Sequence, residues 1–266
     1  MNAIRLTLVL CCLLPLPAWG QIVQRVVSLN LCTDQWLVLL APEKVAGLSP
    51  LAGDPALSFV ADAAARLPMV RASAEAVMAL HPDLVLGARF GAQTRLGLLE
   101  RAGLQVEKLD IPTDFPGIRT ALRTTAALLG VPGRAAPLID AMDAALPLPE
   151  RQPIRALMWE PRGWTSGPGT MLDAIVRAAG MINAGTGGRV GLEALLRQPP
   201  DLLVLPEDAA GASLATEMLV HPAVRGIAVH TIPRALTICP GPFTAAAVAR
   251  LQHWRAQDSS QTGSIR

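Results

Sequence analysis

The chain has 266 residues, of which 51% are hydrophobic and 17% charged, so a disordered chain is excluded and two lobes of about a hundred residues each are expected. The formal net charge of +2, from 23 basic and 21 acidic residues, predicts no binding to nucleic acid through phosphate neutralisation. Tyrosine is absent, which excludes a tyrosinate metal ligand. Neither lysine, Lys44 or Lys108, follows a glycine, which excludes a P-loop.

The first twenty residues have the pattern of a secretory signal. Arg5 precedes a short apolar run over residues 6–14, and small residues follow up to Gly20, after which we expect cleavage. The run is too short to span a bilayer. A lipoprotein acylated within the Cys11–Cys12 pair is a less favoured alternative, because the hydrophobic stretch before it is very short. We therefore expect residues 1–20 to be a signal peptide and the mature chain to be exported.

Strand and helix patterns alternate through the first half of the mature chain. The segment 83–87 is a continuous apolar run, typical of a strand buried on both faces of a parallel sheet. The alternation favours an α/β fold over a sandwich or a helix bundle. The expected strands are 25–29, 45–48, 83–87 and 106–109, and the expected helices are 33–40, 56–66 and 94–102.

A longer helical region follows. Asp114 is the predicted N-cap and Pro116 suits the first turn. Gly and Pro at 130–133 interrupt the pattern, which resumes over 134–146. The alternation then starts again, with strands expected at 154–159, 201–205 and 228–232 and helices at 170–179, 192–197, 213–219 and 244–254.

The two halves share a sequence signature. EAVMALHPDLVL at 75–86 aligns without gaps on EALLRQPPDLLV at 193–204: a short helix that opens with glutamate, a Pro-Asp turn and a buried strand. Pro-Asp turns are common, but the glutamate eight residues before each aspartate favours a structural pseudo-repeat.

Two lobes place a ligand cleft between them, near the carboxyl ends of the strands. The predicted division is 1–20 signal peptide, 21–112 N-terminal lobe, 113–149 connecting helical region, 150–258 C-terminal lobe and 259–266 disordered tail.

The order and spacing of several segments resemble one family. These are RVVSLN at 25–30, SAEAVMALHPDLVL at 73–86, WTSG at 164–167, AAGMIN at 178–183 and the segment that starts at Glu193. Over essentially the whole mature chain, the sequence resembles the substrate-binding proteins of ABC importers for ferric siderophores, haem and cobalamin. The resemblance implies two doubly wound α/β lobes with mainly parallel sheets, joined by a long rigid helix and moving little about their hinge. It also implies a monomer in the periplasm that docks on a dimer of permease subunits.

Glu75 and Glu193 are the predicted permease contacts. A single glutamate in the first turn of a helix is usually solvated and favoured by the helix dipole. The family, however, uses one exposed glutamate per lobe to meet arginines of the two permease subunits. Charge pairs of this kind set orientation and association rate more than affinity.

Ligand-binding candidates follow the strands of both lobes. Each arginine alone has a solvated surface as its simpler interpretation, and Trp159 fits the core as well as the cleft. Trp164 follows a Pro-Arg-Gly turn, where exposure is favoured. The candidates are Asn30, Cys32, Arg89 and Phe90 in the N-terminal lobe and Trp159, Arg162, Trp164, Arg189, Cys239 and Phe243 in the C-terminal lobe.

No metal-ligand spacing is present in the sequence, and His81 and His221 each precede a proline at a turn. We therefore expect no resident metal or cofactor, and a cargo that is itself a metal complex. The arginines favour an anionic ferric siderophore and leave cobalamin open, whereas the absence of tyrosine argues against haem bound through a phenolate.

Two glycine-rich segments nearly match enzyme motifs. GWTSG at 163–167 imitates a nucleophile elbow with its serine, Ser166, one place late, and GTGGRVG at 185–191 imitates a dinucleotide loop with a misplaced third glycine. We expect no enzyme, and an exported hydrolase of α/β type is the alternative.

Cys32 and Cys239 are the cysteines left after signal cleavage. Each follows a strand, in opposite lobes. They can be two separate buried thiols, a disulfide, or a soft ligand to a bound metal complex. Our hypothesis is that the two sulfurs approach each other across the closed cleft.

Overall fold

The computed structural model describes residues 23–71, 73–91, 93–146, 154–207 and 221–263. The predicted signal peptide at 1–20 and the predicted helix at 213–219 lie outside the described residues. None of the helices in the described part of the chain is long and apolar enough to cross a membrane.

The N-terminal lobe is a four-stranded parallel sheet in the order β2-β1-β3-β4. Alternate residues of its strands enter two different cores, because helices cover both faces. Val26 and Leu84 pack in the cluster with α1, whereas Val27 and Val85 pack in the cluster with α3 and α4. The elements are β1 (Val26–Ser28), α1 (Leu31–Leu40), β2 (Val45–Gly47), α2 (Ala61–Ala64), α3 (Ala74–Met78), β3 (Leu84–Ala88), α4 (Gln93–Arg101) and β4 (Val106–Leu109).

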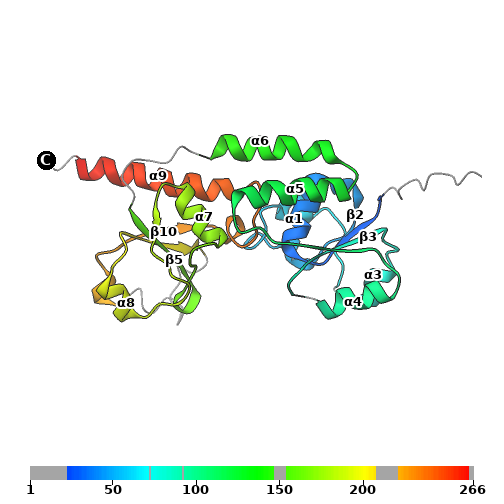
Figure 1. The fold of residues 1–266 in the computed structure, drawn as a ribbon, viewed down its shortest axis with the longest axis horizontal. Helices are drawn as coiled ribbons and strands as arrows, with labels where there is room; N and C mark the ends of the chain where they lie inside the picture. Colours follow the sequence, from blue (N-terminus) through cyan, green and yellow to red (C-terminus); the bar gives the residue numbers. More distant parts are fainter. Residues whose placement is uncertain (1–22, 72, 92, 147–153, 208–220, 264–266) are drawn as a thin grey trace, which may run out of the picture.

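Two helices connect the lobes, α5 (Phe115–Leu128) and α6 (Ala135–Ala145), where the resemblance implied one long helix. Asp114 caps α5 as predicted, its side chain accepting a hydrogen bond from the Gly117 N–H at 2.7 Å. Gly130, at φ +69°, ends this helix, and the short 3-10 helix that begins at Pro132 leads into α6. In Figure 1, α5, α6 and α9 form a layer along one side of the molecule, and the lobes lie below it at opposite ends.

The C-terminal lobe is a six-stranded sheet in which β10, β9, β5 and β7 are parallel and β6 and β8 are added antiparallel. Its helices again cover both faces, so Met158 packs in the cluster with α7 and α9, and Leu157 packs in the cluster with α8. The elements are β5 (Arg155–Glu160), β6 (Trp164–Thr165), α7 (Met171–Ala178), β7 (Ile182–Asn183), β8 (Gly188–Arg189), α8 (Leu192–Arg197), β9 (Leu202–Pro206), β10 (Ala228–Ile232) and α9 (Thr244–Gly263). Short 3-10 helices occur at Pro42–Lys44, Pro50–Gly53, Pro132–Arg134, Pro161–Gly163, Pro222–Val224 and Arg234–Leu236.

Two elements differ in length from their predictions. Helix α9 continues to Gly263, so residues 259–263 are helical where a disordered tail was predicted, because neither proline nor glycine interrupts the chain before Gly263. The helix predicted at 56–66 is reduced to α2. Its first residues form a turn instead, since the Asp54 side chain accepts a hydrogen bond from the Ala56 N–H.

The pseudo-repeat is present in the structure as α3–β3 and α8–β9. Asp83 Oδ2 accepts a hydrogen bond from the Arg25 N–H at 2.9 Å, and Asp201 Oδ2 accepts one from the Arg155 N–H at 2.7 Å. Each aspartate N–H donates in return to the carbonyl of the same arginine, at 2.8 Å in both lobes. The aspartate of each Pro-Asp turn therefore fixes the start of the first strand of its lobe, β1 or β5, in the same way.

Candidate ligand-binding cleft

The carboxyl ends of the two parallel sheets face each other where the lobes meet. The segment after β1 is joined to the segment after β10 by a disulfide, and the segments after β2 and β10 line one cavity. Since β3 is parallel to β1, and β5 to β9 and β10, the residues after β3 and β5 lie on the same two edges. This is where an α/β architecture places its ligand.

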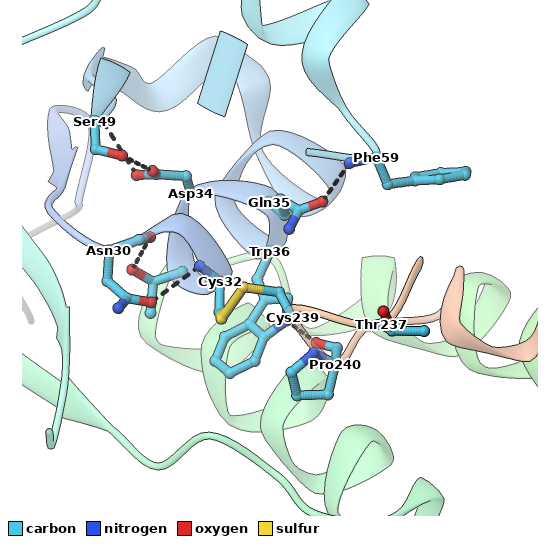
Figure 2. Close-up of a disulfide and its surroundings, with 12 residues drawn as sticks. Asn30, Cys32, Asp34, Gln35, Trp36, Ser49, Phe59, Thr237, Cys239 and Pro240 are labelled. Carbon is cyan, nitrogen blue, oxygen red and sulfur yellow. Dashed lines mark hydrogen bonds between the residues drawn. A yellow bond between two sulfur atoms is a disulfide. The ribbon is translucent and has the colours of Figure 1, made fainter. Parts of the chain in front are cut away.

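Cys32 and Cys239 form a disulfide with a Cα–Cα distance of 5.1 Å, which confirms that the two sulfurs approach each other (Figure 2). Beside it, Trp36 Nε1 donates to the Pro240 carbonyl at 2.8 Å. Both cysteines are buried in the hydrophobic cluster shared by the two lobes. Their assignment as ligand-binding residues is therefore corrected: the sulfurs are bonded to each other inside the junction and do not line an open cleft.

A small cavity of about 290 Å³ lies at the junction, between Ser58 and Phe59 on the N-terminal side and Leu236 and Arg250 on the C-terminal side. Phe59 stacks on Phe243 with their ring centroids 4.7 Å apart. Phe243 was predicted to bind ligand, but it is buried beneath Phe59, whose ring is half exposed. Sequence reasoning missed Phe59 because its segment was assigned to a helix.

Trp164 is the most prominent aromatic residue on the C-terminal side, with 53% of its surface exposed. It lies on the two-residue strand β6, opposite Glu160 of β5 and opposite Arg189 of β8. Arg189 Nε donates to the carbonyl of Arg162, an exposed residue at φ +64°. Three predicted residues are therefore brought together: Arg189 lies opposite Trp164 on the neighbouring strand, and Arg162 is bonded to Arg189 through its backbone carbonyl.

Trp159 does not belong to this surface. It is 1% exposed and packs in the cluster that includes Leu195, Leu203 and Leu205, so its assignment as a ligand contact is corrected. The physical reason is that α8 covers the face of β5 to which its side chain points. Gly163 also packs against the indole, which leaves no space for a side chain there.

The three other candidates of the N-terminal lobe have separate environments. Asn30 caps α1, its side chain accepting from the Cys32 N–H at 2.9 Å. Arg89 forms an exposed ion pair with Asp110, which raises the pKa of the guanidinium through the hydrogen bond and the opposite charge. Phe90 is 79% exposed. The structure does not join these residues into one cluster.

No sequence pattern singled out Asp34, a fully buried carboxyl on α1. Its Oδ2 accepts from the Ser49 hydroxyl at 2.5 Å, and its Oδ1 accepts from the Ser49 N–H at 3.3 Å (Figure 2). Burial raises its pKa to about 7, against the opposite effect of hydrogen bonds from Ser28 and Ser49. Asp34 links α1 to the loop after β2, and so positions two segments of the cleft edge.

The described residues contain no group of three or more histidine, cysteine, aspartate or glutamate side chains that could hold a metal ion. A cavity of about 470 Å³ lies between β4 and α5 within the N-terminal half, with Trp36, Arg89 and Asp110 in its lining. It is separate from the edge that carries Trp164.

Glu75 and Glu193 are both exposed, on α3 and α8 of opposite lobes. Figure 1 shows these helices at the two ends of the molecule, on the side away from the connecting helices. Both glutamates are therefore exposed on helices of opposite lobes, and their contact with a permease stays a prediction.

Comparison with known proteins identifies this architecture. Residues 26–228 match the family model described as periplasmic binding protein. The chain belongs to the periplasmic binding protein family. A search among curated protein sequences found no significant match.

Several of the solved structures similar to this periplasmic binding protein are described as haem-binding proteins. The periplasmic haem-binding protein BhuT, solved with two haems, is 26% identical with a TM-score of 0.70, covering 86% of this chain and 96% of its own. A periplasmic haem-binding protein from Pseudomonas aeruginosa is 25% identical with a TM-score of 0.67, covering 86% and 91%. RhuT from Roseiflexus sp. RS-1, at 23% identity, a TM-score of 0.71 and coverage of 86% and 97%, supports the fold.

These comparisons confirm the predicted family, the two-lobed α/β fold and the role of a periplasmic substrate-binding protein rather than an enzyme. The alternative of an exported hydrolase at Ser166 is wrong. In the structure this serine lies between β6 and α7, where its carbonyl accepts a hydrogen bond from Asn183 Nδ2 at 3.0 Å.

Proposed function

We propose that this periplasmic binding protein captures an anionic metal chelate at the facing edges of its lobes and delivers it to the permease dimer of an ABC importer. The observation that carries the cargo class is the surface of Trp164 and Arg189: a half-exposed indole whose cross-strand neighbour is an arginine, with the exposed Arg162 held next to Arg189 through its backbone carbonyl. An indole face suits a flat or apolar ligand, and guanidinium groups bind carboxylates.

A haem-class tetrapyrrole combines a flat apolar ring with carboxylates, so we place it first among the cargoes. Similarity to two haem-binding proteins at 25–26% identity supports this choice. Because the chain has no tyrosine, iron in such a cargo would be bound without a phenolate. Ferric siderophores and cobalamin, the cargoes expected from the sequence, are the competing candidates.

Tryptophan fluorescence quenching tests the cargo. Haem, cobalamin and several ferric siderophores are titrated into the mature protein and into a Trp164→Phe variant, which keeps an aromatic face but loses the reporting indole. We expect saturable quenching by haem that is strongly reduced in Trp164→Phe. Saturation only by a siderophore or by cobalamin would move the cargo to that class, and saturation by none of them would contradict a chelate-binding protein.

We further propose that Glu75 and Glu193 meet basic residues of the two permease subunits. Both carboxylates are exposed, and the two helices lie on one side of the molecule. Reversing both charges with Glu75→Lys and Glu193→Lys should abolish uptake in cells and leave cargo affinity unchanged. Normal uptake by the double variant would refute this docking assignment.

A further inference from the structure

The two docking helices are anchored in their lobes by equivalent residues. Val77 of α3 and Leu195 of α8 occupy the same place in the pseudo-repeat, two residues after the glutamate, and both are buried. Val77 packs in the cluster behind the N-terminal sheet, and Leu195 packs in the cluster behind the C-terminal sheet. The same face of each helix therefore points into its lobe, and the same face points outward.

The outward faces carry more than a charge. Met78 is 37% exposed and Leu196 is 47% exposed, and each lies three residues after its glutamate. Residues at i and i+3 are neighbours on the surface of a helix. Each lobe thus presents a carboxylate directly beside a large apolar side chain, at equivalent positions of the repeat.

The two halves of the pseudo-repeat also match in the turn that follows each docking helix. The Asp83 and Asp201 carboxylates both accept a hydrogen bond from the backbone at the start of the first strand of their lobe, so the turn that follows each helix is fixed alike. Within the described part of the chain, Glu75 and Glu193 form no ion pair. The carboxylates are therefore available to a partner, and a partner with two equivalent surfaces matches the two equivalent helices.

We infer that Met78 and Leu196 are the apolar halves of two equivalent docking points, each completed by Glu75 or Glu193. The occupant is a two-fold symmetric permease dimer, and each of its subunits presents a basic side chain beside an apolar depression. This inference rests on the proposed function and adds the apolar contact to it. Exposed ion pairs contribute little to affinity, whereas an apolar side chain buried at the centre of a contact contributes more. We therefore expect the two glutamates to orient the protein on the permease, and Met78 and Leu196 to determine how long the complex lasts.

The experiment measures binding of the mature protein to the permease of its organism's own importer in lipid nanodiscs. The test variant is Met78→Ser/Leu196→Ser, the charge variant is Glu75→Gln/Glu193→Gln, and the matched control is Ile182→Ser/Val229→Ser. The control removes two exposed apolar side chains, Ile182 at 48% and Val229 at 51%, that belong to strands β7 and β10 and not to α3 or α8. Thermal melting and cargo titration verify that every variant folds and binds. Met78→Gln/Leu196→Gln serves as a second test variant that keeps side-chain length.

We expect the test variant to dissociate at least tenfold faster with a nearly unchanged association rate. The charge variant should associate more slowly and lose most of its salt dependence. The control should match wild type, and Met78→Ser and Leu196→Ser alone should weaken binding by similar factors. If both apolar variants bind like wild type while the charge variant fails, this inference is wrong and the proposed function stands. If wild type itself does not bind the permease, both are wrong.

Discussion

The disulfide between Cys32 and Cys239 should supply a large share of the stability of this protein. It closes a loop across 207 residues of sequence and joins the two lobes. In the chain-entropy description, a cross-link over a loop of this length lowers the entropy of the unfolded chain enough to stabilise the fold by about 5 kcal/mol. Domains are stable by about 5–15 kcal/mol in total, so the bond is a large fraction of the whole.

The perturbation is the double variant Cys32→Ala/Cys239→Ala, because alanine places no hydroxyl in the apolar junction. Urea and thermal unfolding of the mature protein are followed by circular dichroism. For a chain of this size, a loss of about 5 kcal/mol corresponds to a fall in the melting temperature of roughly 10–20 °C. Wild type reduced with a phosphine before unfolding is the matched control and should show the same fall. Because one hydrophobic cluster spans both lobes, we expect a single transition in each sample.

Two results would refute this reasoning. Rapid and complete thiol labelling of native, unreduced protein would show that the bond is absent. An unfolding free energy that changes by less than about 1 kcal/mol in the double variant would show that loop closure is not limiting in the unfolded chain.

Three further predictions follow from the site and the repeat. Trp164→Ala should weaken cargo binding by about 1–3 kcal/mol in a titration, the loss of an aromatic anchor, and unchanged affinity would show that Trp164 is only surface. Asp34 has a pKa raised from 3.8 to about 7, so it favours folding while protonated; its contribution is full below about pH 4 and is lost as the pH rises to 7. Urea unfolding at pH 5 and pH 7.5 should show a fall in wild type that Asp34→Asn lacks, and equal falls would contradict the buried neutral carboxyl. Asp83→Ala and Asp201→Ala should each lower the unfolding free energy by about 1 kcal/mol, and an effect in only one lobe would refute the equivalence of the two turns.

Much of the fold could be predicted where local and long-range signals agree. Strands β3 and β9 are continuous apolar runs after a Pro-Asp turn, and helix α5 carries its own N-cap at Asp114. The antiparallel strands β6 and β8 could not be predicted in this way. They have two residues each, and their pairing, β6 with β5 and β8 with β6, stabilises them in place of an alternating sequence pattern.

The site was predicted less completely because exposure depends on what covers each strand. Trp159 and Trp164 are five residues apart in the sequence. Helix α8 covers Trp159, whereas Trp164 lies on the short antiparallel strand β6 and is exposed. Phe59 reaches its place by stacking on a residue of the other lobe, and Asp34 by bonding to the loop after β2. The cysteine pair was the exception, since two remaining cysteines after strands of opposite lobes leave few arrangements.

The junction decides how the lobes can move. A disulfide holds its two Cα atoms within about 4.4–6.8 Å, so Cys32 and Cys239 cannot separate by more than about 2 Å beyond their present distance. The Trp36–Pro240 hydrogen bond and the shared core act at the same place. Opening of the cleft is therefore a rotation with this junction as its pivot, and parallel separation of the lobes is excluded while the bond is intact. Because the junction already restricts the relative motion of the lobes, little conformational entropy is lost when cargo binds. A freely hinged protein would lose more entropy on binding and would therefore bind less tightly.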